Sequence, residues 1–156
     1  MILEGAQAGL SWITILRKRA NYKKLFDNFD PEIVANYNTQ KINFLMENSG
    51  IIRNRLKIQS AVQNAKSFLD IQKEYGCFDK YIWQFIGGKP ITHRWKVLED
   101  IPAKTDVSIL ISKELKKRGF NFVGPTICYA FMQAVGMVND HTTDCFRFHE
   151  VKKING

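Results

Sequence analysis

"SKELKKRGFNFVGPTICYAFMQAVG", residues 112–136, contains two amphipathic helical patterns joined by a short turn that has a glycine at each end. The first pattern ends at Gly119, and Pro125 suits the first turn of the second helix, where a backbone N–H would be unpaired anyway. The stretch therefore predicts a helix, a hairpin and a second helix. We expect helical packing of this kind to decide the fold.

The turn between these two patterns has the properties of a phosphate-binding loop. Glycines let backbone N–H groups approach a phosphate closely, and the N-terminus of the second helix adds a positive dipole. Such a turn is also common in plain helical bundles, but 23 Lys and Arg against 15 Asp and Glu give a net charge of +8, which favours DNA. The candidate phosphate-binding residues are Lys116, Lys117, Arg118, Gly119, Gly124 and Thr126.

Helical periodicity also dominates the rest of the chain. Asp30 and Pro31 form a cap and first-turn pair, Thr39 is a second candidate cap, and Gly76 ends the longest pattern. Residues 89–104 contain two prolines without sustained periodicity and are predicted to be an irregular connection. No stretch shows a convincing alternating strand pattern, so we predict an all-α protein. The predicted helices are 11–26, 29–37, 39–50, 54–76, 78–88 and 105–120.

Length and composition indicate one globular domain. The chain has 156 residues, of which 45% are hydrophobic and 12% aromatic. No apolar run is long enough for a transmembrane helix, and Glu4 interrupts the apolar start where a signal peptide would continue. We expect a cytoplasmic protein without a membrane partner. The three cysteines do not suggest a disulfide framework, and Cys128 is expected in the core.

A second informative stretch is "LEGAQAGLSWITILRKR", residues 3–19. From the residues alone, Glu4 is an exposed helix carboxylate, Leu10 a packing residue and Trp12 a core aromatic side chain. The alternative is a binding site, because a carboxylate and an aromatic face both attract cations. The residues by themselves leave this choice open.

Four segments together carry a resemblance to a known family. They are residues 3–19, the stretch "NSGIIRNRLKI" at 48–58, the stretch 115–141, and the pair His141 and Cys145. In this order and at this spacing they resemble the DNA-3-methyladenine glycosylase I family of the helix-hairpin-helix DNA glycosylase superfamily. The resemblance covers nearly the whole chain. It implies an all-α helical bundle of the helix-hairpin-helix glycosylase type, and an enzyme of base excision repair that flips N3-methyladenine out of DNA and excises it.

The resemblance also implies roles for three residues of the N-terminal stretch. Glu4 is expected to act in catalysis at the foot of the base pocket, where it accepts hydrogen bonds from the adenine edge. Trp12 is expected to stack on the base, and Leu10 to enter the duplex in place of the flipped nucleotide. Stacking is worth about 1–3 kcal/mol per base and extrusion costs a few kcal/mol, so Leu10 and Trp12 would offset much of the flip.

The same resemblance implies the remaining features of the reaction. The partner is double-stranded DNA containing alkylated adenine, the enzyme acts as a monomer, and catalysis needs no cofactor. Asp140 lies near the region where many superfamily members have a catalytic aspartate. The resembled family is understood to manage without that aspartate, so we expect Asp140 to be a cap or a structural carboxylate.

His141 and Cys145 are expected to be zinc ligands. A structural zinc takes about four ligands. In the resembled family the other two, a cysteine and a histidine, belong to an N-terminal arm, whereas Met1 stands three residues before Glu4. We therefore expect residues 1–156 to be a single glycosylase domain lacking that arm. Zinc is expected only where the arm is present, and without it the segment after His141 is expected to be loosely held.

The absent arm also leaves a second interpretation open. In the family the arm contributes aromatic walls of the base pocket. A chain that lacks it would, in the alternative interpretation, be a catalytically silent DNA-binding remnant of the same family, truncated at the N-terminus.

One prediction follows from residues 125–126. Superfamily members that also cut the DNA strand have a Schiff-base lysine just after the hairpin, whereas this chain has Pro125 and Thr126. We expect a monofunctional enzyme that leaves an abasic site. Incubation with methylated DNA and borohydride should yield no covalent protein–DNA adduct on a denaturing gel. A trapped adduct would contradict this prediction.

Overall fold

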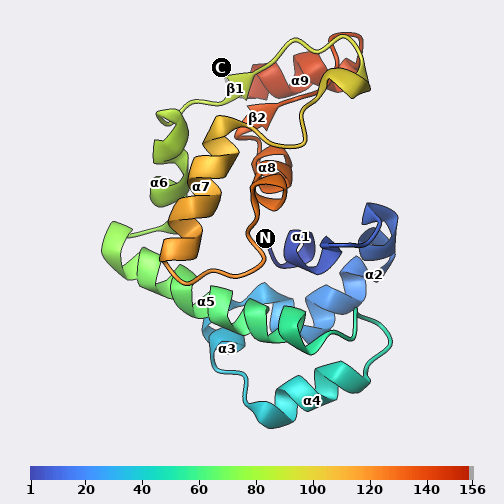
Figure 1. Ribbon diagram of the computed structural model, residues 1–156, viewed down its shortest axis with the longest axis vertical. Helices are drawn as coiled ribbons and strands as arrows, with labels where there is room; N and C mark the ends of the chain where they lie inside the picture. The colour runs from blue at the N-terminus through green and yellow to red at the C-terminus, as the bar shows by residue number, and fades with distance from the viewer. Residues whose placement is uncertain (155–156) are drawn as a thin grey trace.

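The computed structural model describes residues 1–154. Its regular structure is mostly helical, as the sequence predicts (Figure 1). A parallel pair of two-residue strands, β1 (Ile91–Thr92) and β2 (Val138–Asn139), is the exception. The helices are α1 (Ile2–Gln7), α2 (Trp12–Leu25), α3 (Pro31–Ala35), α4 (Thr39–Glu47), α5 (Arg55–Tyr75), α6 (Phe78–Trp83), α7 (Asp106–Lys117), α8 (Pro125–Ala134) and α9 (Phe146–Ile154).

Helix α5 runs through the middle of the molecule and joins two apolar cores (Figure 1). Its first half packs Ile58 against the core that α2, α3 and α4 close. Its last turns pack Ile71 against the core of α6, α7 and α8. Both isoleucines are almost completely buried, so replacing either with alanine would cost about 2–5 kcal/mol of folding stability. Asn54 caps the start of α5, and Gly76 ends it with a φ of 82°, as the sequence predicts.

Local capping explains where most of the other helices begin. The Asp30 side chain accepts hydrogen bonds from the Glu32 and Ile33 N–H groups, which confirms the predicted cap. Helix α7 begins with a capping box in which Thr105 and Ser108 bond each other reciprocally.

Two predicted helix ends differ from those in the structure. The cap of α4 is Asn38 rather than Thr39, because the Asn38 side-chain oxygen Oδ1 accepts the Lys41 N–H. The predicted helix 78–88 stops early: α6 ends at Trp83, and a 3-10 turn, Gln84–Ile86, leads to Gly87 in the left-handed conformation. Further 3-10 turns lie at Asp27–Phe29 and Leu98–Asp100.

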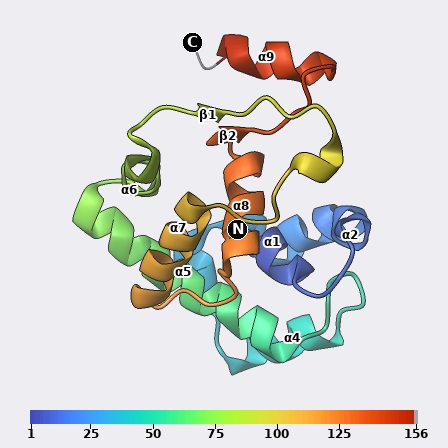
Figure 2. The ribbon, with the colours of Figure 1, turned by 45° about the horizontal axis from the view of Figure 1, so that its top comes forward.

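The expected irregular connection, residues 89–104, crosses the top of the molecule and pairs with the chain after α8 (Figure 2). The prediction of no strands was wrong here, since Ile91 pairs with Val138 and Thr92 with Asn139. Strands of two residues are too short to show an alternating pattern. This pairing brings the connection against the segment 137–140.

The chain after His141 is better fixed than expected. It forms α9, in which Phe148 is 5% exposed and its carbonyl oxygen accepts a hydrogen bond from the Asn139 side chain. Thr143 also donates its N–H to the Trp95 carbonyl oxygen. The expectation of a loosely held segment is therefore wrong for the described part of α9. Among residues 1–154, no helix is long and apolar enough to cross a membrane.

Candidate functional site

Glu4 lies on α1, which contacts α2, α5 and α8. The residue is 8% exposed, so the interpretation of Glu4 as an exposed carboxylate was wrong. Its Oε2 lies 2.6 Å from the α-amino nitrogen of Met1, an ion pair without the angles of a hydrogen bond. No other donor within residues 1–154 bonds to this oxygen. The site therefore holds a buried carboxylate oxygen without a hydrogen-bond donor among the described residues.

Trp12 begins α2 and is 40% exposed, which contradicts its interpretation as a core residue. Its side chain and Glu4 line one open cavity of about 410 Å³, although eight positions separate them. The remaining walls come from Gln7 of α1 and from Ala130, Gln133 and Ala134 of α8. The structure thus brings together the two residues that the sequence proposed for base binding. It adds Gln133, which sequence reasoning missed.

Glu4 also borders a second cavity, of about 310 Å³, whose walls are mostly apolar. Its lining includes Phe29 and Phe120 and lies between the two cores. We assign base binding to the cavity with Trp12, because that cavity offers an exposed aromatic face and shares Gln7 and Ala130 with the groove beside Leu10.

Leu10 lies in the tight turn between α1 and α2 and is 39% exposed. Gly9 enters this turn with a φ of 76°, a conformation that side chains other than glycine rarely adopt. Lys57, at the start of α5, donates from Nζ to the carbonyl oxygens of Ala6 at 2.9 Å and Ala8 at 2.6 Å. Burial lowers the pKa of Lys57. The lysine ties down the end of α1 and so fixes the direction in which Leu10 projects.

The predicted hairpin leads into α8, and the first residues of α8 lie close to the turn that contains Leu10. Leu10 and Thr126 line one groove together with Ile127 and Ala130. The residue expected to enter the duplex therefore lies beside the predicted phosphate site. Gly119 requires its glycine, since its φ is 87°. Gly124 has an ordinary φ of −60°, and a β-carbon added there would meet no atom within 4 Å. The N-terminus of α8 is therefore open to an incoming group.

The three basic residues before Gly119 differ in their surroundings. The Arg118 guanidinium forms two hydrogen bonds with the Glu74 carboxylate and one with the Tyr75 hydroxyl. The bond to Arg118 lowers the pKa of Glu74, and Glu74 raises that of Arg118. Lys117 pairs with Glu114 at 2.6 Å on the surface, where such a pair opens easily. Lys116 is exposed. The bonds of Arg118 hold the end of α7 to α5, and a phosphate contact of Arg118 stays a prediction.

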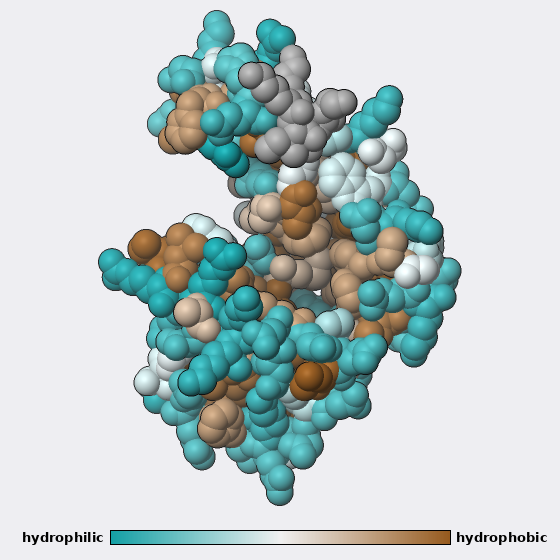
Figure 3. Space-filling model, turned by 180° about the vertical axis from the view of Figure 1, so that it is seen from behind, coloured by the Kyte–Doolittle hydropathy of each residue, from teal (hydrophilic) through white to brown (hydrophobic). Residues whose placement is uncertain are grey.

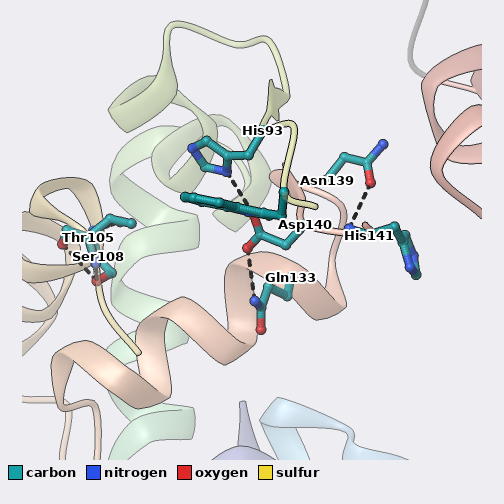
Figure 4. Close-up of polar contacts among 8 residues, drawn as sticks. His93, Thr105, Ser108, Gln133, Asn139, Asp140 and His141 are labelled. Carbon is teal, nitrogen blue, oxygen red and sulfur yellow. Dashed lines mark hydrogen bonds and ion pairs between the residues drawn. The ribbon is translucent and has the colours of Figure 1, made fainter. Parts of the chain in front are cut away.

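Asp140 follows β2 and forms the centre of a polar cluster (Figure 4). Its Oδ1 lies 2.6 Å from His93 Nδ1 and accepts the indole N–H of Trp95 at 2.8 Å, while Oδ2 accepts from Gln133 Nε2 at 2.9 Å. Burial favours a raised pKa, but the groups that face the carboxylate, Tyr129 first, hold the pKa of Asp140 below its ordinary value. The expectation of a structural carboxylate agrees with these contacts.

His141 and Cys145 do lie together, with 3.7 Å between Nδ1 and Sγ. This distance suits two ligands of one ion. Among residues 1–154, however, no group of three or more His, Cys, Asp or Glu side chains could hold a metal. Cys128 is buried, and burial raises the pKa of its thiol to about 12, as expected for a core residue. The described residues therefore supply two ligands of about four.

The cavities form a continuous line along α8. The groove of Leu10 and Thr126 adjoins the cavity of Glu4 and Trp12 through Ala130, and Gln133 and Ala134 connect that cavity to a third one beside Asp140 and His141. Figure 3 shows this side from behind, hollowed between the part that carries α9 and the part that carries α1 and α2. Such a surface can hold a phosphate, fill a gap in a duplex and enclose one planar cation.

Comparisons with known proteins match most of the chain. The sequence profile of the methyladenine glycosylase family matches residues 1–148. A DNA-3-methyladenine glycosylase of Haemophilus influenzae is 50% identical over 143 residues, which cover 92% of this chain and 77% of that protein. A crystal structure of 3-methyladenine DNA glycosylase I has a TM-score of 0.90 and 48% identity, covering 93% of this chain and 80% of the other. A variant of such an enzyme, in complex with 3-methyladenine, has a TM-score of 0.90 and 37% identity, covering 93% and 78%.

The open N-terminus of α8 leads to a prediction for Gly124→Val. Valine fits the backbone angles at this position and the space around it, so the melting temperature should stay within a few degrees of that of the wild type. Its branched side chain would keep a phosphate away from the N–H groups of α8. Because hydrogen bonds to charged groups contribute about 1.5–3 kcal/mol, duplex binding should weaken at least tenfold. Fluorescence anisotropy with several duplexes measures this effect. Unequal losses between sequences would argue against a phosphate contact.

Proposed function

The chain belongs to the methyladenine glycosylase family and excises 3-methyladenine from DNA by hydrolysing the N-glycosidic bond, and we propose that the cavity between Glu4 and Trp12 holds the flipped base. One observation carries this proposal: the buried Glu4 carboxylate and the exposed Trp12 ring face the same cavity. The carboxylate has no regular hydrogen bond within residues 1–154.

The charge of the lesion explains why these two residue types suit it. Adenine methylated at N3 carries a positive charge while it is attached to the sugar. An anionic oxygen and an aromatic face both attract a cation. Neutral adenine lacks this charge, so Glu4 and Trp12 together favour the methylated base.

Leu10 enters the duplex in this proposal. It lies on a turn that Gly9 and Lys57 hold, beside the groove that leads to Thr126. A duplex bound at the hairpin through Lys116, Lys117 and the backbone of 119–124 would meet this side chain next. The gap left by the flipped nucleotide would then be filled by an apolar group, which offsets part of the cost of unstacking.

Hydrolysis itself requires little from the protein. The positive charge makes 3-methyladenine a good leaving group, so the enzyme has mainly to select the base and stabilise an oxocarbenium-like state. Glu4 supplies negative charge near that state, and water attacks the sugar carbon. The product is an abasic site, since Pro125 and Thr126 offer no amine for a covalent intermediate.

The substrate of this reaction is double-stranded DNA, on which the protein acts as a monomer in the cytoplasm. The net charge of +8 and the single line of cavities along α8 support one duplex bound per chain. The alternative of a catalytically silent remnant predicts DNA binding without base release, and the excision assay below separates the two.

We propose the structural zinc as a feature of chains that contain the family's N-terminal arm. His141 and Cys145 would supply two ligands, and the ion would hold the end of β2 and the start of α9 to that arm. A tetrahedral site needs two further donors, and residues 1–154 place none beside this pair.

Glu4→Gln tests the role of the carboxylate. The substitution keeps the shape of the side chain and removes the charge that favours the cationic base. Release of 3-methyladenine from methylated DNA should fall about 100-fold, since a charge-assisted hydrogen bond contributes up to about 3 kcal/mol, while duplex binding survives. The exposed Glu47→Gln on α4 is the matched control. An unchanged excision rate in Glu4→Gln would show that the role is wrong.

Metal content tests the zinc proposal. Residues 1–156 alone, dialysed against a mild chelator, should retain well under one zinc per chain, because two ligands bind the ion weakly. Elemental analysis combined with intact mass measures this. One retained zinc per chain, in a protein whose intact mass equals that of residues 1–156, would contradict the proposal.

A further inference from the structure

The Asp140 cluster has no part in the mechanism above, yet it adjoins the base cavity. Side chains from two segments converge on this carboxylate: His93 and Trp95 from the connection after β1, and Gln133 from α8. The Asp140 side chain is 6% exposed. An indole N–H can only donate a hydrogen bond, so Trp95 requires Oδ1 to be an acceptor.

The carboxylate fixes which way the Gln133 amide points. A glutamine amide has an NH₂ group that donates and an oxygen that accepts, and the two can exchange places by a rotation. An ionised carboxylate only accepts, so the NH₂ group of Gln133 must face Asp140. The Gln133 oxygen is then directed to the other side. Figure 4 shows this oxygen turned away from Asp140.

The residue that carries this oxygen lines the base cavity. Gln133 lines the cavity of Glu4 and Trp12 as well as the cavity of Asp140. Its side chain is exposed, and among the side chains described, those of residues 1–151, no donor bonds to its Oε1. Asp140 therefore turns a group that could donate or accept into a fixed acceptor. The cavity presents two acceptors, Glu4 from α1 and Gln133 from α8.

We propose that Gln133 is a specificity residue whose Oε1 accepts a hydrogen bond from the exocyclic amino group of the flipped base, and that Asp140 is the positioning residue that keeps it an acceptor. This inference rests on the proposed function. It extends that function by assigning the residue that distinguishes an amino group from a carbonyl oxygen at position 6 of the base.

The discrimination follows from the chemistry of position 6. Adenine has an NH₂ group there, which can donate to Gln133 and to Glu4 at once, since it has two hydrogens. Guanine has a carbonyl oxygen there, which would face two acceptors without a donor between them. Two acceptors that face each other without a donor cost more binding free energy than the loss of one hydrogen bond does. 3-Methylguanine carries the same positive charge as 3-methyladenine, so charge alone does not separate the two bases.

Gln133→Met tests the inference directly. Methionine has a similar length and no hydrogen-bonding amide, and the exposed position should tolerate it. The measurement is the single-turnover release of 3-methyladenine and of 3-methylguanine from the same methylated DNA, separated by chromatography. Release of 3-methyladenine should fall about tenfold, as expected for one lost hydrogen bond, while release of 3-methylguanine stays the same or rises. Gln40→Met, exposed on α4, should change neither rate.

Asp140→Asn and the double variant test the positioning role. Asparagine can donate as well as accept, so the Gln133 amide is free to rotate and the preference for 3-methyladenine should fall in the same direction. The double variant Gln133→Met/Asp140→Asn should show the same preference for 3-methyladenine as Gln133→Met alone. Both changes act through the Gln133 Oε1 atom, so their effects should not add. If Asp140→Asn does not fold, the Gln133→Met result still decides the inference.

The outcomes distinguish this inference from the proposed function. If the wild type releases no 3-methyladenine, the proposed function fails, and this inference fails with it. If the wild type releases it and Gln133→Met leaves the ratio of the two bases unchanged, the inference alone is overturned. Equal losses of both bases also overturn it, since they show a structural effect rather than recognition at position 6.

Discussion

The burial of the Glu4 carboxylate is the constraint on which the site depends. The residue is 8% exposed, and removing a carboxylate from water costs free energy that packing elsewhere has to offset. Helix α1 supplies that packing through its contacts with α2, α5 and α8. The same contacts place Trp12 beside the carboxylate and Leu10 at the mouth of the next groove. The packing of α1 therefore accounts both for the unfavourable burial of Glu4 and for the affinity of the cavity for a cation.

Helix α8 orders the steps of recognition along its length. Positions three or four apart on a helix share a face, so Thr126, Ala130 and Gln133 follow one another on the side that meets α1 and the turn after it. In the proposed function, the N-terminus of α8 provides N–H groups for a phosphate, its middle borders Leu10, and its last turn borders the flipped base. The hairpin that begins α8 thus sets the distance between the DNA backbone and the flipped base.

Local signals in the sequence predicted most of the helices, and distant contacts account for the failures. Periodicity and caps such as Asp30 and Gly76 act within a few residues, so they can be identified from the chain alone. The roles proposed for Glu4 and Trp12 came from family resemblance, because composition left both as ordinary residues. The bonds from Arg118 to Glu74 and from Gln133 to Asp140 were not foreseen, and the strand pair β1–β2 was too short to leave a pattern. Arg118 and Glu74 are 44 positions apart, a separation at which a sequence gives no sign of contact.

The central claim is that a methylated adenine lies between the Glu4 carboxylate and the Trp12 ring, and NMR titration with free 3-methyladenine tests it most directly. The chain has three tryptophans, so its indole N–H signals can be assigned by single Trp→Phe variants. The account predicts that the Trp12 signal shifts on saturation, that the Trp83 signal in the core of α6 and α7 does not, and that adenine produces a much smaller shift at the same concentration. A shift confined to Trp83, or equal responses to adenine and 3-methyladenine, would contradict the account.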